Sequence, residues 1–494
     1  MFVKDSSLTR RVPVVGWDSA GTPLRGLMLA YTAVIAIAVV AVVSTIRVGQ
    51  AWFPSSEAAS AFTQVAAATA AVHGAAAALR NPTATLILQL LLIVGAAQLL
   101  GAVARALRQP VVIGEMAVGI VLGPTILGQL WPEASAYAFS ASSLAHLQLI
   151  SQFGVILYMF TVGLDVDLLQ LRRRAHTAVA VSHVSIVVPF CLGVLAALGL
   201  YREYAPPGAA FGTFALFIGT ALSITAFPVL TRILDERGLT RTPLGMIALA
   251  CAAVDDITAW TLLAFVVALA TAGGAGIALL SIVTLAGAFI ALMVFVARPL
   301  VARFLDRSEP LDRGRVAIVL AIVFASALTT ELVGVHALFG AFLAGTIMPA
   351  AGGVRDALRL RLETFASVVL LPVFFAFTGL RTEIGLLDDG ASWLVFAAML
   401  LVAVAGKLAG TLVAARATGS SWHDSFVLGV LMNTRGLMEL IALNVGYDLG
   451  IISARMFTIM VLVALATTAA ACPLIDVADA LQRRRADRVP VPAG

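Results

Sequence analysis

Long apolar runs recur along almost the whole chain, and they restrict its fold more than any other feature. About fourteen segments of roughly 20 residues carry few charged side chains, which is the length a helix needs to cross a hydrocarbon core of about 30 Å. Helices are expected, because irregular backbone or sheet edges facing lipid would leave polar groups unsatisfied. Charged residues fill only 12% of the 494 positions, about half the share usual in soluble domains. The sequence therefore predicts an all-α polytopic membrane protein and excludes an ordinary soluble domain.

The first apolar run stands apart from the others. It covers 25–48 and precedes an alanine-rich stretch, so we expect residues 1–82 to form a cytoplasmic segment, an extra uncleaved transmembrane helix and an external loop. Thirteen core spans are predicted at 83–104, 110–128, 143–164, 176–200, 208–233, 243–271, 275–303, 314–333, 335–350, 362–381, 391–416, 424–447 and 455–475. Residues 476–494 are left as a short basic cytoplasmic tail.

Basic residues give the chain an orientation. When the spans are threaded alternately with the N-terminus inside, 25 of the 32 Lys and Arg residues fall in cytoplasmic loops, as the positive-inside rule requires. The threading puts both termini in the cytoplasm and predicts a multi-pass protein of the plasma (cell inner) membrane. Because the basic residues lie in separate short loops, a nucleic-acid surface is not indicated.

Few ionisable residues lie within the predicted spans, and each is a candidate for function because burying a charge in lipid is costly. They are Glu115, Asp255, Asp256, Glu331, Lys407, Arg435 and Glu439. Asp255 and Asp256 are neighbours and point about 100° apart on a helix, so they need different partners. We expect Lys407 to pair with one of them. The other carboxylate is then free to bind a proton or a small cation, unless both belong to a static salt-bridge network.

Two of the spans look interrupted in mid-membrane. Residues 222–229 (LSITAFPV) bring Ser223, Thr225 and Pro228, and residues 432–439 (MNTRGLME) bring Asn433 and Thr434. Matched interruptions in two halves of a chain are typical of secondary transporters, in which broken helices expose backbone groups to a midplane site. We expect an inverted repeat of 83–271 against 314–475, linked by 275–303. A simple proline kink is the alternative explanation of the first interruption.

Several short motifs occur in an order and spacing that resemble one family. They are 109–115 (QPVVIGE), 122–124 (LGP), 160–165 (FTVGLD), 225–229 (TAFPV), the Asp255-Asp256 pair, 336–345 (HALFGAFLAG), 371–375 (LPVFF), Lys407 and 433–436 (NTRG). Over about 83–475 the chain resembles the monovalent cation:proton antiporter-2 family. That family includes bacterial sodium/proton antiporters, glutathione-gated potassium efflux systems and plant cation/proton exchangers.

The resemblance implies a sodium/proton antiporter-like fold and a homodimer with elevator-like alternating access. Its dimerisation helices would cover about 83–164 and 314–381, its core helices about 176–271 and 391–475 with two crossed broken helices, and its linker 275–303. Carried over by position, Asp256 binds the cation and the proton, Asp255 pairs with Lys407, and Thr225 and Asn433 lie at the helix crossing. The resemblance also implies electrogenic exchange of two protons for each cation.

The supporting residues have more ordinary interpretations. Arg435 and Glu439 are expected to brace the core rather than bind the ion. Glu115 serves equally well as part of a proton path or as a bracing contact beside Gly114. Glu331 is expected to be exposed, and His336 to be a packed histidine, with a pH sensor as the alternative.

Other classes of function are weaker fits. No GxSxG or HExxH motif supports an enzyme, and no cofactor is predicted. An anion carrier would keep an unpaired Arg or Lys, whereas here a carboxylate is in excess. A cation channel or potassium efflux pathway is the main alternative. We therefore predict an antiporter whose partners are monovalent cations, protons and the lipid bilayer, with the choice between sodium and potassium left open.

Overall fold

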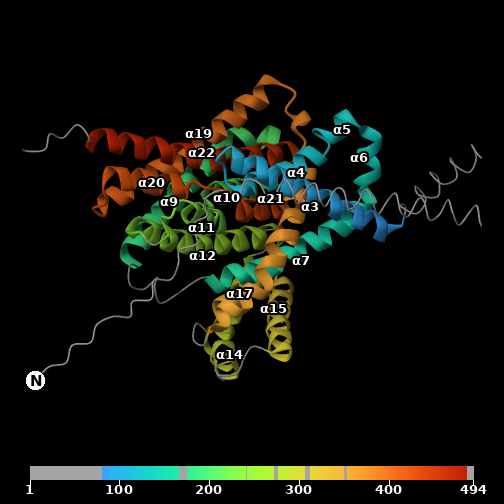
Figure 1. Ribbon diagram of the computed structural model, residues 1–494, viewed down its shortest axis with the longest axis horizontal. Coiled ribbons are helices and arrows are strands. Elements are labelled where there is room, and N and C mark those ends of the chain that lie inside the picture. The colour runs from blue at the N-terminus through green and yellow to red at the C-terminus, as the bar shows by residue number, and fades with distance from the viewer. Residues whose placement is uncertain are drawn as a thin grey trace, which may run out of the picture. The chain divides into compact units, whose positions relative to one another are not determined.

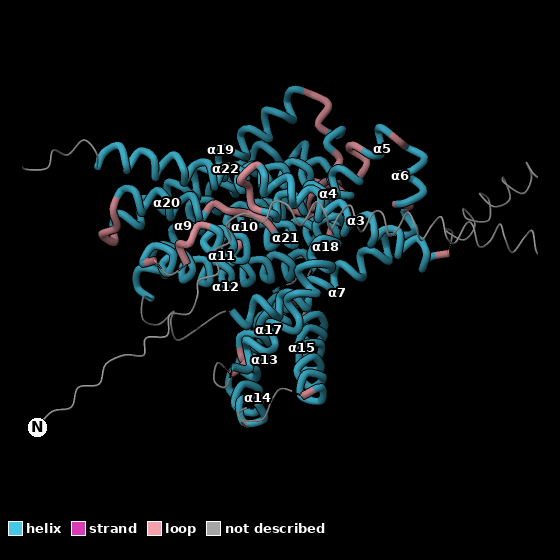
Figure 2. The backbone as a smooth tube through the Cα atoms, viewed as in Figure 1, coloured by secondary structure: helices cyan, strands magenta, loops and turns pink. Residues whose placement is uncertain are grey.

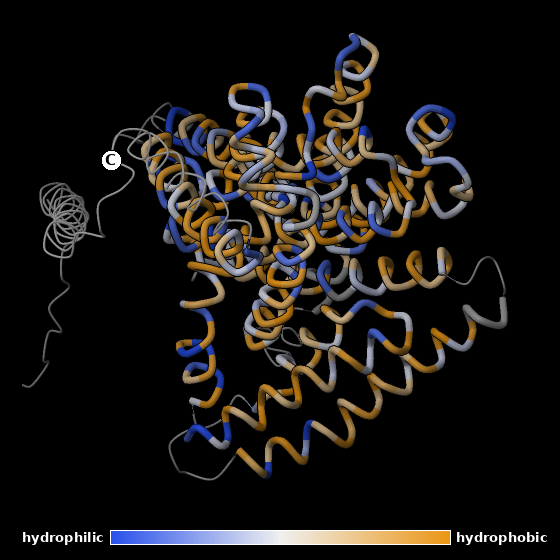
Figure 3. Tube along the Cα trace, turned by 90° about the vertical axis from the view of Figure 1, so that its right-hand side faces the viewer, coloured by the Kyte–Doolittle hydropathy of each residue, from blue (hydrophilic) through white to orange (hydrophobic). Residues whose placement is uncertain are grey.

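The computed structural model describes residues 81–165, 175–240, 242–271, 276–305, 312–349 and 353–486. Within these ranges the chain is helical and contains no strand (Figure 2). Hydrophobic residues predominate along the helices, and hydrophilic stretches gather mainly at the helix ends and connections (Figure 3). The all-α prediction is confirmed for this part of the chain. The predicted N-terminal helix at 25–48 lies outside it.

The helices form two successive series joined by a linker. The first series is α3 (Pro82–Ala106), α4 (Val111–Leu122), α5 (Leu127–Leu130), α6 (Pro132–Ala138), α7 (Ala141–Asp165), α9 (Ala175–Tyr204), α10 (Phe211–Ser223), α11 (Phe227–Glu236) and α12 (Pro243–Thr271). The linker is α13 (Gly276–Leu292), the π-helical turn η1 (Met293–Ala297) and α14 (Arg298–Leu305).

The second series begins after the linker. It comprises α15 (Arg313–Val333), α16 (Ala337–Thr346), α17 (Val354–Phe365), η3 (Ala366–Leu370), α18 (Leu371–Leu380), η4 (Ile384–Leu386), α19 (Gly390–Ala417), α20 (Trp422–Met432), α21 (Leu437–Asp448) and α22 (Ala454–Ala486). The last helix continues past residue 475 into the segment that the sequence assigned to the basic tail.

The number of spans differs from the prediction at one place. Among the described residues, twelve helical stretches are long and apolar enough to cross a bilayer, whereas thirteen were predicted there. The prediction of a full span at 335–350 is wrong, because α16 has only ten residues and is therefore about 15 Å long, half the hydrocarbon thickness. Hydropathy detected one long apolar stretch that continues past α15. Gly334, with a left-handed φ of 87°, ends α15, and the remainder of the stretch forms only the short helix α16.

Close packing of glycines gives α4 and α16 equivalent surroundings. On α4, a Cβ at Gly119 would meet the Ala376 carbonyl oxygen of α18 at 2.2 Å. On α16, a Cβ at Gly345 would meet the Phe160 carbonyl oxygen of α7 at 2.3 Å. Each helix also carries a second glycine five residues earlier, packed against the helix before it, α3 or α15. Small residues let helix backbones approach in this way, and the matching pattern supports an internal repeat.

The contacts sort the helices into two groups; most of the helices are labelled in Figure 1. Group one contains α3, α4, α7 and α15 to α18, and group two contains α9 to α12 and α19 to α22; contacts within each group are far denser than those between them. Group two holds the two most enclosed spans. Phe211–Glu236 is 89% buried and Trp422–Asp448 is 94% buried, whereas Leu280–Leu305 of the linker is only 11% buried. The enclosed pair is where the helices break.

Candidate ion-binding site at two broken helices

The two interruptions meet each other inside group two. α10 ends at Ser223 and α11 begins at Phe227, while α20 ends at Met432 and α21 begins at Leu437. At the crossing, the Ala226 amide donates to the Thr434 carbonyl at 3.0 Å. Buried backbone groups must find partners, so each break satisfies part of the other.

The side chains of the interruptions fall at this crossing or beside it. The Thr225 hydroxyl lies 2.8 Å from the Met432 carbonyl. The hydroxyls of Ser223 and Thr434 instead donate to carbonyls three residues back in their own chain segments. Pro228 occupies the first turn of α11, where a missing N–H removes no helical hydrogen bond. The proline therefore starts a new helix after an extended break and does not merely kink a continuous one.

Arg435 ties the second break to the end of α10. Its guanidinium donates to the Ala221 carbonyl at 2.9 Å and to the Leu222 carbonyl at 2.7 Å, and it forms a 2.8 Å ion pair with Glu439. Both charged side chains are fully buried. A cation at a helix C-terminus is favourable because the last carbonyls are unsatisfied and carry partial negative charge. This geometry supports the bracing interpretation of the pair.

Asp255 on α12 has both carboxylate oxygens engaged. Lys407 Nζ of α19 lies 2.8 Å from Asp255 Oδ2, and the Thr225 hydroxyl lies 2.6 Å from the same oxygen. Ser182 of α9 donates to Oδ1 at 2.5 Å, with Ser185 further away at 3.4 Å. Lys407 also donates to the Thr225 hydroxyl at 2.5 Å. Asp255 and Lys407 thus form a fully buried ion pair with little unused hydrogen-bonding capacity.

Asp256 has a different environment, as its direction on the helix predicts. Its side chain is 1% exposed and has the backbone of Phe227, the first residue of α11, as a hydrogen-bond partner. Its Oδ1 has no hydrogen-bond partner in the described ranges of the chain. The Asn433 Oδ1 at the other break also lacks one. Unpaired buried acceptors are costly, and oxygen atoms of this kind are the ligands that a proton or a hard cation takes.

The charges of the cluster do not balance. Asp255, Asp256 and Glu439 supply three carboxylates, and Lys407 and Arg435 supply two cations. With every group ionised the buried cluster carries one net negative charge, so one monovalent cation or one proton would neutralise it. Among the described residues no three His, Cys, Asp or Glu side chains gather as they do in a transition-metal site.

Three of the predicted candidates lie outside this cluster. Glu115 on α4 is partly buried, with Arg232 and Arg105 near enough to act on it electrostatically. Glu331 is exposed and accepts a hydrogen bond from the Ala337 amide at the start of α16. His336 is the N-terminal cap of the same helix, with its Nδ1 3.5 Å from the Leu338 amide. The last two cap the start of α16.

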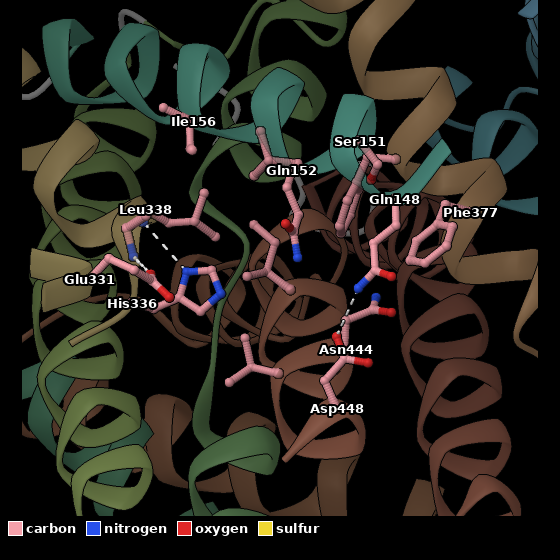
Figure 4. Close-up of a pocket in the computed structure, with 15 residues that line it drawn as sticks. Gln148, Ser151, Gln152, Ile156, Glu331, His336, Leu338, Phe377, Asn444 and Asp448 are labelled. Atoms are coloured by element: carbon pink, nitrogen blue, oxygen red, sulfur yellow. Dashed lines mark hydrogen bonds between the residues drawn. The ribbon is translucent and has the colours of Figure 1, made fainter. Parts of the chain in front are cut away.

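His336 and Glu331 line a cavity of about 310 Å³ where group one meets α21 (Figure 4). Gln148, Gln152, Asn444 and Asp448 contribute polar groups from α7 and α21. Arg381, after α18, crosses between the groups and pairs with Asp448 at 2.5 Å. The cavity thus lies at the boundary between the two helix groups, and apolar side chains such as Phe374 and Phe377 line it beside the polar ones.

Two residues of the site were missed by sequence reasoning. Ser182 and Ser185 lie within hydrogen-bond distance of Asp255 Oδ1, but they are small uncharged residues within a predicted apolar span, so a search for buried charges does not find them. Their spacing of three residues puts them on one face of α9. That polar face was the available signal.

Comparison with protein families gives one matching model, described as sodium/hydrogen exchanger, transmembrane, over residues 90–475. The Na(+)/H(+) antiporter NhaS4 of Synechocystis sp. is 42% identical over 402 residues, which cover 80% of this chain and 97% of that protein. Cation/H(+) antiporter 17 of Arabidopsis thaliana is 38% identical and K(+)/H(+) antiporter 1 of Saccharomyces cerevisiae is 35% identical, over 79% and 74% of this chain. The matches span 48% and 43% of those two longer proteins.

Solved structures show the same fold. The sodium proton antiporter MjNhaP1 from Methanocaldococcus jannaschii superposes with a TM-score of 0.57 at 16% sequence identity. The alignment covers 80% of this chain and 97% of that structure. At this identity the likeness speaks for the fold alone.

Proposed function

The chain belongs to the sodium/hydrogen exchanger family, a family of membrane transporters and not of enzymes, and we propose that it is a secondary active monovalent cation:proton antiporter. The observation that supports the proposal most directly is Asp256 Oδ1, which is buried without a hydrogen-bond partner among the described residues. It lies beside the Asp255–Lys407 ion pair, in which the two charges already neutralise each other. The relatives' names include sodium, potassium and unspecified cations, so the proposal covers the monovalent cations as a class.

The two neighbouring aspartates take different roles in this proposal. Asp256 is the group that exchanges a cation for a proton, because it alone of the pair keeps a free carboxylate oxygen. Asp255 holds Lys407 and is in turn held by Thr225 and Ser182. The Asn433 Oδ1, also unpaired, is the second oxygen that we assign to the cation. Glu115 is left with a supporting role on α4.

Competition for Asp256 couples the two fluxes. Inside, the carboxylate loses its proton and binds a cation; after the site has crossed to the outside, a proton displaces the cation. An empty site would carry the net negative charge of the cluster across the barrier, at a cost of at least about 2.5 kcal/mol. While Lys407 stays protonated, that cost suppresses the uncoupled step, because the cluster is neutral when loaded with a cation or a proton and charged when empty.

The ion pair also supplies a route to electrogenic exchange. If the arriving cation draws Asp255 into its coordination and Lys407 releases its proton, two protons leave for each cation bound. The membrane potential then contributes about 2.3 kcal/mol per net charge for each 100 mV. Exchange in which Lys407 keeps its proton is electroneutral, so a current on a solid-supported membrane distinguishes the two schemes.

The two helix groups suggest how access alternates. We propose that group two, with its crossed broken helices, moves as a body against group one, which forms a homodimer through its helices at about 83–164 and 314–381. The sparse contacts between the groups support this division. In the proposed threading α16 is the inverted counterpart of α4. Its ten-residue helix covers only about half of the hydrocarbon core, and the segments on either side of it complete the crossing, which keeps both termini in the cytoplasm of a plasma (cell inner) membrane protein.

Asp256→Asn tests the proposal in proteoliposomes that contain a pH-sensitive dye. The wild-type protein should collapse a pH gradient when sodium, potassium or lithium is added. Asp256→Asn should abolish the response, and Glu236→Gln, which changes an exposed carboxylate of a surface pair, should leave it intact. Full exchange by a folded Asp256→Asn protein contradicts the proposal. Cation current without proton movement would instead identify a channel or a potassium efflux pathway.

A further inference from the structure

One turn along α12 from Asp256 lies a second buried group without a partner. Trp260 is 4% exposed, and its indole Nε1 finds no hydrogen-bond partner among the residues that the structure describes. An indole N–H can only donate, whereas the unpaired Asp256 Oδ1 can accept. A buried donor and a buried acceptor are therefore both unsatisfied on one helix, next to the proposed ion site.

Helix geometry brings these two groups to one place. Residues four apart lie on the same face of a helix, with Cβ atoms about 5–6 Å from each other. Side chains lean toward the N-terminus of their helix, so a residue covers the turn that precedes it. Ideal helix geometry therefore directs the Trp260 side chain toward the turn that bears Asp256. The two polar atoms nevertheless make no direct hydrogen bond.

The hydrogen-bonding groups around Asp255 do not fill the gap. Thr225, Ser182 and Lys407 are all directed to Asp255. Within the described part of the chain, the hydrogen-bond partner of Asp256 is the backbone of Phe227. Whatever joins Oδ1 to the indole must therefore both accept from an N–H and donate to a carboxylate. A water molecule does both, and buried waters typically occupy sites with two or more unsatisfied polar groups.

We propose that Trp260 is a positioning residue for ion binding, holding a water molecule that bridges its indole Nε1 to Asp256 Oδ1 and serves as a ligand of the transported cation. The inference rests on the proposed function of Asp256. The water accepts from the indole and donates one hydrogen to the carboxylate. Its second lone pair is left for the cation, which exchanges part of its hydration for a pre-oriented oxygen.

The role predicts a specific kinetic signature. Trp260→Phe keeps an aromatic ring and removes only the N–H, so the water loses its anchor. In proteoliposomes the half-saturating cation concentration should rise roughly tenfold, the effect of one hydrogen bond within a charged site, with little change in the maximal rate. Protons should compete better, so half-maximal exchange should require a pH higher by about one unit.

Two further variants control the measurement. Trp393→Phe makes the same change at an exposed tryptophan of α19 and should behave as wild type. Trp260→His restores a ring N–H and should recover part of the cation affinity. Wild-type half-saturation and an unchanged pH profile in Trp260→Phe would overturn the inference, as would equal losses in the Phe and His variants.

A spectroscopic measurement covers the case in which Trp260→Phe does not fold. In protein labelled with 15N at the indole nitrogens, the chemical shift of the Trp260 N–H group in the NMR spectrum should change when sodium or potassium is added. The shift should be absent in Asp256→Asn, and an unmoved signal in the wild-type protein overturns the inference. These results test the role of Trp260 separately from the proposed function, because the proposed function is contradicted only if Asp256→Asn still exchanges ions.

Discussion

Replacing Lys407 by alanine leaves the Asp255 carboxylate buried without its cation. The lysine is fully buried, 2.8 Å from Asp255 Oδ2, and the described charges nearest to it are those of Asp255, Arg435 and Glu439. Thr225 and Ser182 still donate to Asp255, but hydroxyls do not neutralise its charge. Removing one partner of a buried pair costs about 3–5 kcal/mol, so we expect a strongly destabilised protein.

The second substitution identifies the cause of that loss. Asp255→Asn keeps the size of the side chain and removes its charge, so Lys407→Ala combined with Asp255→Asn leaves no unpaired ion. The double variant should therefore be more stable than the sum of the single losses predicts, by a coupling energy of about 1–3 kcal/mol. At no more than about 2 °C per kcal/mol for a chain of this size, Lys407→Ala alone should lower the melting temperature by several degrees.

Thermal melting of detergent-solubilised protein, followed by size-exclusion chromatography, measures the three variants side by side. A double variant that is more stable than the two single losses predict would show that Lys407→Ala destabilises the protein by leaving the Asp255 carboxylate unpaired. Additive melting shifts would refute the reasoning, because they would mean that the lysine stabilises the fold through its apolar stem or through Thr225 and not through Asp255.

Two further predictions concern packing and pH. Gly345→Ala should destabilise the protein by about 1–3 kcal/mol, because the new Cβ would lie 2.3 Å from the Phe160 carbonyl oxygen; Gly95→Ala, where a Cβ meets nothing within 4 Å, should be neutral or slightly stabilising in the same melting assay. Hydrogen bonding by Ser392 holds the pKa of Asp389, the exposed N-cap of α19, below its usual range. A carboxyl whose pKa is lowered by folding stabilises the protein at any pH above its pKa in the unfolded chain, near 3.8, and this stability is lost as the pH falls through its pKa in the folded protein. The melting temperature of the wild-type protein should therefore fall more steeply on acidification below pH 4 than that of Asp389→Asn. Parallel curves would contradict the assignment.

Hydropathy alone found most of the helices, because a lipid-exposed helix must be apolar for about 20 residues. It failed at 335–350 for a physical reason. α16 is enclosed by α7 and α15, so its length is set by glycine-mediated packing against its neighbours and not by the thickness of the bilayer. Hydropathy cannot separate a short enclosed helix from a full span when both are apolar.

The site, too, could be predicted only in part from the sequence. Charge singled out Asp255, Asp256 and Lys407, since ionisable groups are rare in lipid and costly to bury. The neutral partners, Ser182 and Ser185, gave no such signal. Their importance depends on α9 packing against α12, and long-range packing is not readable from one sequence.

The sequence by itself determined that this protein lies in a membrane, where most of its helices are, how they are predicted to be oriented, and which few charged residues lie among them. These properties follow from local composition, because each span must satisfy its own backbone and exclude charge without help from its neighbours. The residues alone left open which carboxylate holds the lysine; the family resemblance implied Asp255, and only the tertiary structure gives the contacts behind that division. That division depends on α9, α10, α19 and α20 arriving together around α12, and the free energy of a buried charge is set by the partners that surround it.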